Sequence, residues 1–458
     1  MSAQIKRLLD RSKAEYVTCA FVDLNGNLRG HFVSREQFEA SLGSGLGLLP
    51  EAVVLGVNDE IFIPEGYLSF DMPFADDKAT VAGGDPRHLP EYPPDKDLFF
   101  FLDFPQGGSG NLWAPRQIYA RAEARLSALG LTPIVGCEYE FRVYAETHAT
   151  ALAKGFKNLD MAASRSGYMN VARQSASVEF LSGLLDMCKT LGIGVASMHW
   201  EHGVGMLEVA LAHQKGIRAP DNAVLFKEFS KVYADRRDHI ASFMAKPVLH
   251  EDGSSNHVHL SLVTANGRNA FYDARDPNGM SKTQRHFIGG IQKLLPEFML
   301  MIAPNSNSWR RFVADAFAPL AATWGVENRT TSVRVIPGGR RSQRLEFRAA
   351  GADTNAYLVQ ACLLGMSAWG IERQLEPRRP IQRSAYAHRS RLPKSIKFPT
   401  GIRQAIAAFR SSKAARELFG SDFVEIFAGT RQAQLDALAD MRGRTSHTAE
   451  LKTFLSGI

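Results

Sequence analysis

The sequence contains little cysteine: only four of its 458 residues are Cys. These residues, Cys19, Cys137, Cys188 and Cys362, lie far apart and show none of the spacings of a metal-binding cluster. The pattern excludes a disulfide framework and is typical of a protein from a reducing compartment. Any bound metal must therefore rest on oxygen and nitrogen ligands.

A long apolar segment is also absent. No stretch approaches the length needed to span a bilayer, and the residues from Met1 to Arg7 are not followed by the apolar region of a secretory signal. With 45% hydrophobic and 22% charged residues, the composition is that of a globular protein. We expect it to be cytoplasmic and to have no membrane partner.

Basic residues are in excess and give a net charge of +7, but they form no long tract. They are scattered or lie in short clusters, namely Arg310-Arg311, Arg340-Arg341 and Arg378-Arg379. Nucleic acid could be bound by such clusters, but small anionic substrates such as nucleotide phosphates explain them equally well. Of the two classes we favour the small anions, and we expect no nucleic-acid partner.

The first hundred residues show the pattern of a small β-rich unit. Strands are predicted from Tyr16 to Asp23 and from Leu28 to Val33, joined by a turn at Asn25-Gly26, and Ser34 is the predicted cap of a short helix. A Gly-rich segment near residues 106–111 indicates a domain boundary, which we place between residues 107 and 108. Beyond it the main predicted elements are a helix over 115–129, a strand over 134–144, a helix over 177–191, a hairpin over 194–211, a helix over 219–241 and strands over 257–262, 331–336 and 344–348.

The strand predicted from Ile134 to Tyr144 alternates charged and apolar side chains. Glu138, Glu140 and Arg142 point to one face, and the residues between them are apolar. Two neighbouring carboxylates repel each other in a half-enclosed site unless a cation lies between them, so a divalent metal is the natural ligand. A strand with a solvated face would show a similar pattern.

The same alternation recurs in other strands, which favours the metal site. His257, His259 and Ser261 share one face of their strand, and so do the charged residues of the strand over 344–348. Glu208 begins another alternating segment. Solvated faces usually mix Lys, Thr, Ser and Gln, whereas these faces carry mostly Glu, His and Arg, which bind divalent cations and phosphate oxygens.

These segments belong to an ordered series of motifs. The motifs are Gly136-x-Glu138-x-Glu140-Phe141, Glu201-x6-Glu208, Lys246-Pro247, Gly253-Ser254-x-x-His257-x-His259-x-Ser261, Asn307-Ser308-x-x-Arg311, Ala318-Pro319, Asn328-Arg329-x4-Arg334 and Glu346-x-Arg348 with Asn355-x-Tyr357. In order and spacing they resemble the glutamine synthetase superfamily, and the resemblance runs from about Tyr16 to Pro377.

The resemblance implies an α+β fold. A small N-terminal β-grasp-like domain would cover residues 1–107, and a catalytic domain with a curved antiparallel sheet flanked by helices would cover residues 108–458. It also implies a homo-oligomer, a dodecamer of two hexameric rings, because the N-terminal domain of one subunit completes the site of its neighbour in this family.

The resemblance further implies an ATP-dependent ligase that joins the γ-carboxylate of glutamate to ammonia or an amine through a γ-glutamyl phosphate. Two Mg²⁺ or Mn²⁺ sites are implied, one formed by Glu140, Glu201 and Glu208 and a second by Glu138, His257 and Glu346. Arg329 would be the catalytic residue that stabilises the transferred phosphoryl group. The remaining roles would be ATP binding for His259, Ser261, Arg334 and Arg344, and glutamate binding for Gly253, Arg311 and Arg348.

The sequence departs from the family pattern in the amine pocket. Ammonia-using members carry a Glu just before the Ala-Pro pair, where this chain has Phe317, and Met206 replaces a Gln. An aromatic ring cannot act as a base but can pack against an alkyl or aryl group, so the pocket resembles that of γ-glutamyl-amide ligases such as γ-glutamylmethylamide synthetase. Three alternatives stay open: Asp315 serves in place of the Glu, the protein is an ordinary glutamine synthetase, or it is a non-catalytic binding or structural relative.

Overall fold

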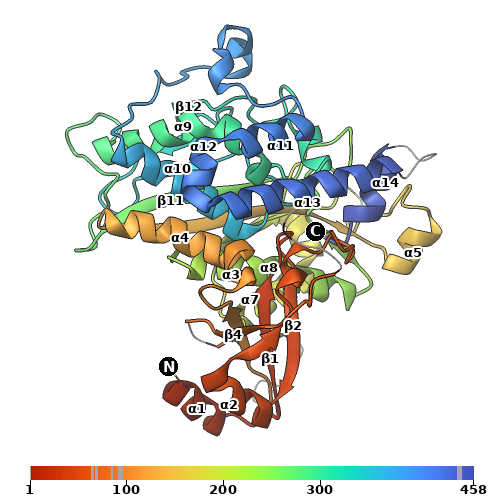
Figure 1. Cartoon of the computed structure of the whole chain (residues 1–458). Coiled ribbons are helices and arrows are strands. Elements are labelled where there is room, and N and C mark those ends of the chain that lie inside the picture. The colour runs from red at the N-terminus through yellow and green to blue at the C-terminus, as the bar shows by residue number, and fades with distance from the viewer. Residues whose placement is uncertain are drawn as a thin grey trace.

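The computed structural model describes residues 2–62, 67, 71–83, 86–90, 96–163, 165–440 and 446–458. Within these residues, no helix is both long and apolar enough to cross a membrane. The strands form two sheets (Figure 1).

The smaller sheet is built by the N-terminal part of the chain, with strand order β2-β1-β5-β4-β3. Its strands are β1 (Tyr16–Val22), β2 (Leu28–Ser34), β3 (Leu46–Leu48), β4 (Asp77–Val81) and β5 (Phe99–Asp103). β1 and β5 run parallel, and the other pairs are antiparallel. The predicted hairpin is confirmed: Gly26 takes a φ of 96°, and the Ser34 side chain accepts a hydrogen bond from the backbone N–H of Gln37 at the start of α2.

The larger sheet carries the predicted site residues. Its strands are β6 (Leu131–Tyr144), β7 (Val195–Trp200), β8 (Met206–Leu211), β9 (Gln214–Lys215), β10 (Ile240–Ser242), β11 (Asn256–Thr264), β12 (Trp324–Val326), β13 (Val333–Ile336) and β14 (Arg344–Phe347). The main order is β12-β13-β14-β11-β6-β8-β7, and β9 and β10 also pair with β6. All of these pairs are antiparallel except β12 with β13.

Helices pack around both sheets. They are α1 (Ser2–Arg11), α2 (Arg35–Ser44), α3 (Ser109–Trp113), α4 (Pro115–Ala128), α5 (His148–Ala153), α6 (Val171–Ala176), α7 (Val178–Thr190), α8 (Arg218–Asp235), α9 (Lys282–Ile302), α10 (Ala356–Glu372), α11 (Ile402–Ser411), α12 (Lys413–Phe419), α13 (Ser421–Asp440) and α14 (Ser446–Phe454), with 3₁₀ turns η1 (Pro50–Val54), η2 (Asn307–Arg311), η3 (Tyr386–Arg391) and η4 (Lys394–Ile396). In Figure 1, the red and brown N-terminal strands lie at one end, with α1 and α2, and the blue C-terminal helices lie over the larger part.

The apolar face of β6 is core, as its alternation predicts. Tyr139 and Phe141 are buried and contact Phe226 of α8, with ring centroids 5.9 Å and 6.0 Å apart, and Phe141 stacks on Phe243 at 4.7 Å. Burial of such large apolar surfaces fixes which face of β6 points inward. The charged face is therefore turned toward the site.

One predicted helix is wrong at its end. The helix expected to reach Ala241 ends at Asp235, and Ile240–Ser242 instead pairs with β6 opposite Tyr144 to Arg142. Asp238 takes a left-handed φ of 57°, which breaks the helix. The last two residues of the predicted helix instead belong to a short buried strand.

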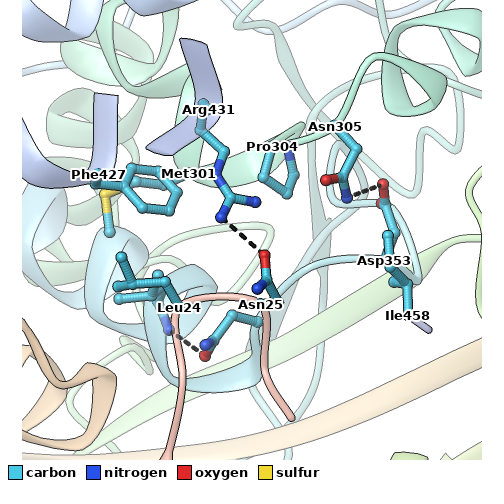
Figure 2. A pocket seen from close by; sticks show the side chains of 11 residues that line it. Leu24, Asn25, Met301, Pro304, Asn305, Asp353, Phe427, Arg431 and Ile458 are labelled. Carbon is cyan, nitrogen blue, oxygen red and sulfur yellow. Dashed lines mark hydrogen bonds between the residues drawn. The ribbon is translucent and has the colours of Figure 1, made fainter. Parts of the chain in front are cut away.

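The N-terminal hairpin turn inserts into the larger part of the molecule. Figure 2 shows Arg431 of α13 pointing at Asn25, whose Oδ1 accepts a hydrogen bond from Nη2 at 2.8 Å across a cavity of about 10 Å³. Asn355, at the start of α10, donates to the carbonyl of Asp23 at 2.8 Å.

The predicted domain boundary at 107/108 lies between the two sheets in the sequence, because β5 ends at Asp103 and α4 begins at Pro115. That the two parts fold as separate domains stays a prediction.

Candidate metal and nucleotide site

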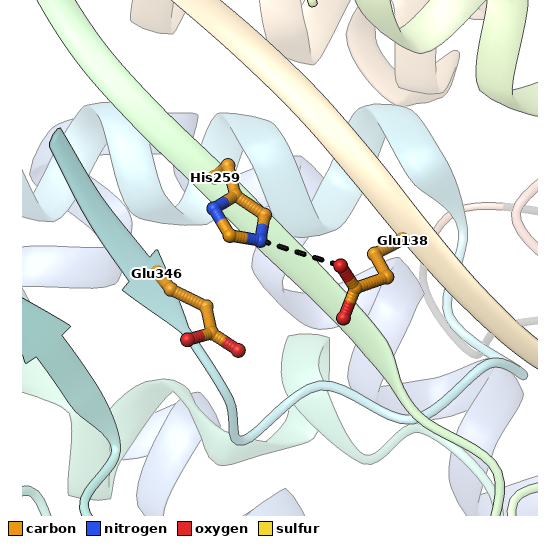
Figure 3. A group of neighbouring side chains, drawn as sticks. All are labelled: Glu138, His259 and Glu346. Carbon is orange, nitrogen blue, oxygen red and sulfur yellow. Dashed lines mark ion pairs between the residues drawn. The ribbon is translucent and has the colours of Figure 1, made fainter. Parts of the chain in front are cut away.

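Three neighbouring strands, β6, β11 and β14, bring acidic and imidazole side chains together on one face. His257 lies opposite Glu138 in the β11–β6 pairing; its Nδ1 is 2.9 Å from Glu138 Oε1 and 3.8 Å from Glu346 Oε1. His259 Nε2 is 3.6 Å from Glu138 Oε2, and Figure 3 shows the two side chains beside Glu346. The side-chain alternation of the sequence therefore places these four predicted residues in one cluster.

The cluster continues onto β8 and β7. Glu140 lies opposite Glu208 in the β6–β8 pairing, and Glu208 lies opposite His199 in the next pairing. His199 Nε2 is 3.2 Å from Glu201 Oε1 and 3.6 Å from Glu208 Oε1. Sequence reasoning missed His199, although its place two residues before Glu201 in a predicted strand was an available signal.

The potential ligand atoms do not fall into the two predicted sets alone. Three overlapping groups have their atoms within 4.8 Å of one another: Glu138, His259 and Glu346; Glu138, Glu208 and His257; and His199, Glu201 and Glu208. Glu140 instead accepts a hydrogen bond at Oε2 from the backbone N–H of Ser255 at 2.7 Å. The six predicted ligands are thus gathered along one line of the sheet, and their assignment to particular ions stays a prediction.

The close spacing of carboxylates along this row of side chains favours the binding of a divalent cation. Burial, together with the carboxylates of Glu138, Glu140, Glu201 and Glu346, raises the pKa of Glu208 to about 9. Burial also opposes ionisation of Glu138 and Glu346, but the nearby histidines, together with Arg348 at Glu346, hold the pKa of both below the ordinary value. Several ionised carboxylates next to one that resists ionisation form a site that a cation would stabilise, and oxygen-rich sites suit Mg²⁺ or Mn²⁺.

Arginines flank the cluster on the β13–β14 side. Arg334, opposite Glu346 in the pairing, places Nη1 3.1 Å from Glu346 Oε2, and Arg348 pairs with the same carboxylate. Arg344 Nε is 3.4 Å from His259 Nδ1. Guanidinium groups at the end of a carboxylate row are suited to anionic oxygens that approach from outside.

A cleft of about 390 Å³ opens beside the cluster. It is lined by Ile134, Gly136, Cys137, Glu138, Ala196, Ala210, Leu211, His213, His259, Leu260, Ser261, Arg341, Ser342, Gln343 and Arg344. Three of the four residues predicted to bind ATP therefore line one cleft, and Glu138 joins it to the acidic row. Arg341 and His213 line it too and were not predicted from the sequence.

The residues predicted to bind glutamate lie close together, because Arg311 contacts both the Arg348 backbone and the surroundings of Gly253. Arg311 is buried, and its Nη1 and Nη2 donate to the carbonyls of Ala349 at 2.8 Å and Arg348 at 2.9 Å. Burial lowers the pKa of Arg311 to about 10, while Glu140 acts in the opposite direction. Gly253 packs so closely that an added Cβ would lie 2.6 Å from the Ala245 carbonyl and 2.8 Å from Arg311 Cγ, so only glycine fits.

The remaining predicted residues are less enclosed or lie apart. Arg329 is exposed on the turn after β12, and its backbone carbonyl accepts a hydrogen bond from Arg348 Nε at 3.0 Å. Phe317 is 60% exposed with a φ of 52°, whereas Met206 is buried, with its sulfur 3.9 Å from Ser254 Oγ. An amine pocket shared by Phe317 and Met206 stays a prediction.

Comparison with known proteins first defines the class. The sequence matches the family described as glutamine synthetase, catalytic domain, over residues 113–450. Type-1 glutamine synthetase 2 of Dictyostelium discoideum is 31% identical over 432 residues, covering 92% of this chain and 80% of that protein. Gamma-glutamylethanolamide synthetase GlnA4 of Streptomyces coelicolor is 31% identical over 441 residues, covering 95% of this chain and 92% of that protein.

The chain therefore belongs to the glutamine synthetase family, whose members are carbon–nitrogen ligases. Family members use ATP and divalent metal ions and act on glutamate with ammonia or an amine. Among solved structures, the GmaS/ADP complex matches with a TM-score of 0.82 at 23% identity, covering 99% of both chains. This likeness confirms the predicted α+β fold.

Proposed function

We propose that the protein is an ATP-dependent ligase that joins the γ-carboxylate of glutamate to an organic amine through a γ-glutamyl phosphate. The observation that carries the proposal is the line of Glu, His and Arg side chains across β7, β8, β6, β11 and β14, with a nucleotide-sized cleft beside it. In water near neutral pH a carboxylate and an amine form a salt rather than an amide, so the carboxylate has to be activated first.

The activation step brings a polyanion to an anion. A γ-carboxylate oxygen of glutamate attacks the γ-phosphorus of ATP, the bond to ADP breaks, and an acyl phosphate forms. His259, Ser261 and Arg344 line the cleft in which ATP would bind, and Arg334 pairs with Glu346 of the acidic row. Arg329 would donate to the transferred phosphoryl group from its exposed turn, where charge develops.

Mg²⁺ or Mn²⁺ is the cofactor that we propose, with two or three ions per site. Glu140, Glu201 and Glu208 would hold one ion, and Glu138, His257 and Glu346 a second; His199 is an added candidate because its ring lies between Glu201 and Glu208. When bound, the ions would neutralise phosphate and carboxylate oxygens that otherwise repel each other.

The second step needs a held glutamate and an amine that loses a proton. The amine nitrogen attacks the acyl carbon, the bond to the phosphate oxygen breaks, and inorganic phosphate leaves with the proton that the amine gives up. Arg311 and Arg348 would pair with the glutamate carboxylates, and Gly253 would offer backbone to its amino-acid end. The buried positions of these two arginines support a fixed substrate orientation.

The choice of amine rests on the loop around residue 317. Phe317 offers no base, which supports an organic amine, and Asp315 is the carboxylate of this loop that stands as the alternative. Burial raises the pKa of Tyr386 to about 12; Arg348 and Arg311 act against this rise, and the charge of Asp315 adds to it. Ordinary glutamine synthesis with ammonia is therefore the second candidate function.

Phosphate release with ammonia, ethanolamine, isopropylamine and putrescine tests the proposal. We expect kcat/KM for at least one organic amine to exceed that for ammonia by about ten-fold, the size of effect that one or two methylene groups produce in an apolar pocket. Comparable or better turnover with ammonia would instead favour glutamine synthesis. A non-catalytic role would follow if no amine supports turnover and calorimetry detects no binding of Mg²⁺ and ATP.

We also propose a homo-oligomer, a dodecamer of two hexameric rings, in a reducing compartment such as the cytoplasm. The four cysteines are free and buried, which supports the compartment. Exposed apolar side chains support self-assembly, among them Tyr168, Met169, Val171 and Val178.

A further inference from the structure

A second cavity, of about 350 Å³, lies away from the acidic line. It is enclosed by α9, β12 and a C-terminal segment, residues 378–397, which we call the strap. Its lining residues are Gln292, Thr323, Trp324, Arg378, Arg379, Ile381, Leu392, Pro393 and Ile396. None of them belongs to the proposed metal, nucleotide or glutamate sites, and the volume is in the range of small-molecule pockets.

The wall of this cavity is largely apolar because its polar groups are already paired. Trp324 Nε1 donates to the carbonyl of Arg378 at 2.6 Å, and the Arg378 N–H donates to Gln292 Oε1 at 2.7 Å. Gln292 Nε2 in turn donates to the carbonyl of Ala322 at 2.9 Å. The indole of Trp324 and the aliphatic side chains of the strap are left to contact a ligand.

The rim of the cavity is cationic. Arg378 and Arg379 are exposed, and within the described ranges neither guanidinium has a hydrogen-bond or ion-pair partner. Glu376, the acidic residue nearest to them in sequence, is engaged with His286 at 3.1 Å and with Arg285 at 3.8 Å. Two neighbouring guanidinium groups over an apolar floor complement a ligand with a carboxylate and a compact apolar body.

The strap is hydrogen-bonded to the turn that carries Arg329. Asn328 Nδ2 donates to the carbonyls of Ile381 and Arg383, both at 2.9 Å, and Thr330 Oγ1 accepts from the N–H of Ala385 at 2.8 Å. These two partners of the strap are the residues on either side of Arg329. The position of the strap therefore bears directly on the turn of the proposed catalytic residue.

The strap also holds the loop of the proposed amine pocket. Tyr386 donates from its hydroxyl to the carbonyl of Ala318 at 3.0 Å, next to Phe317. The N–H of Ala322 donates to the carbonyl of Ile396 at 2.7 Å, at the far end of the strap. One segment thus spans the cavity, the Arg329 turn and the Phe317 loop.

We propose that this cavity is a regulatory site for a small organic anion, a carboxylate with an aryl or branched alkyl body. The carboxylate pairs with Arg378 and Arg379, and the apolar body packs against Trp324 and Leu392. Occupancy fixes the strap and with it the Arg329 turn, which changes the rate of the ligase; this second part rests on the proposed function.

Calorimetry with three matched probes tests the binding part. Indole-3-acetate carries both features, indole-3-acetamide keeps the shape without the charge, and acetate keeps the charge without the apolar body. The full chain is titrated with saturating Mg²⁺ and ADP present, so that the nucleotide cleft is filled. We expect indole-3-acetate to bind, the amide to bind about ten-fold more weakly, as for loss of a charge-assisted hydrogen bond, and acetate not to bind detectably.

Variants test whether indole-3-acetate binds in this cavity rather than elsewhere on the surface. The double variant Arg378→Gln/Arg379→Gln should weaken indole-3-acetate binding about ten-fold or more, and Leu392→Trp should block it by filling the cavity. Arg403→Gln, an exposed arginine on α11, is the matched control and should bind like the unmodified protein. Absence of binding in the presence of ADP, or equal affinity in the double variant and the control, would each overturn the site.

A kinetic experiment tests whether occupancy of the cavity changes the rate of the ligase. With saturating ATP, glutamate and amine, indole-3-acetate should change kcat for phosphate release in the unmodified protein and in Arg403→Gln, but not in the double variant. Binding with an unchanged kcat would overturn the regulatory part while leaving the binding site intact. Because calorimetry needs no turnover, a failure of the ligase proposal does not obscure the binding result.

Discussion

At the scale of single residues, we expect position 317 to determine which amine is used. Phe317→Glu introduces the carboxylate that ammonia-using relatives of the resembled family carry at this place. We expect kcat/KM for ammonia to rise about ten-fold or more relative to the best organic amine, because a positioned base removes the proton from the attacking nitrogen. Phosphate release under matched conditions measures this ratio.

Asp315→Asn is the companion variant. We expect it to leave the amine preference unchanged, because Phe317 is the residue that the motif order predicts for the family position. Loss of amine turnover in Asp315→Asn, combined with an unchanged preference in Phe317→Glu, would show instead that Asp315 is the base.

Glu208 should make the stability of the metal-free protein depend on pH. Its pKa of about 9 in the fold lies far above the ordinary 4.5, so the stability linked to its proton is fully present below pH 4.5 and is lost as the pH rises through 9. The melting temperature in EDTA should fall from pH 6 to 9, and stabilisation by Mg²⁺ should grow over the same range, because a carboxylate has to lose its proton to bind metal. Differential scanning fluorimetry measures both trends.

A matched variant isolates this effect. Burial lowers the pKa of Lys227 to about 7, so Lys227 contributes a change of stability of opposite sign in the same pH window. The informative quantity is therefore the difference from Glu208→Gln, which should lack the fall assigned to Glu208. Identical pH profiles for the two proteins would contradict the crowded carboxylate site.

At the scale of helices, the contact between α9 and α10 depends on two glycines. A Cβ at Gly370 would lie 2.4 Å from the carbonyl of His286 and 2.5 Å from the Cα of Gly290. Overpacking in Gly370→Ala should cost about 1–3 kcal/mol against a gain of about 1 kcal/mol in helix propensity, so we expect a net destabilisation of up to about 2 kcal/mol. Thermal denaturation measures the loss.

Gly43→Ala is the control for this prediction. Gly43 lies in α2, and a Cβ there would meet nothing within 4 Å. Its substitution should stabilise by roughly 0.5 kcal/mol. A similar gain in both variants would mean that the two helices have room to separate.

The elements that sequence reasoning predicted well are those with strong local signals. Side-chain alternation predicted β6, β11 and β14, and turn and capping residues predicted the first hairpin and α2. The end of α8 was wrong because Ile240–Ser242 is held by pairing with β6, a contact that is distant in sequence. His199 was missed for a similar reason: its importance appears only when β7 pairs with β8 and brings its ring to Glu208.

At the scale of the whole molecule, we expect self-assembly. Twelve chains of 50.5 kDa give a particle of about 606 kDa. Mass photometry of the purified protein should show this species as the main one, because the exposed apolar side chains near α6 and α7 gain from mutual burial. A main species at the mass of a single chain would contradict the dodecamer.

The central claim is that acids and imidazoles from separate strands converge to hold divalent ions between a nucleotide and a glutamate. Crystals grown with Mn²⁺, ADP and a phosphinic glutamate analogue test it most directly through the anomalous signal of manganese. The account predicts peaks between Glu138, His257 and Glu346 and between Glu140, Glu201 and Glu208. Well-ordered crystals with bound ADP and no anomalous peak at this line would contradict it.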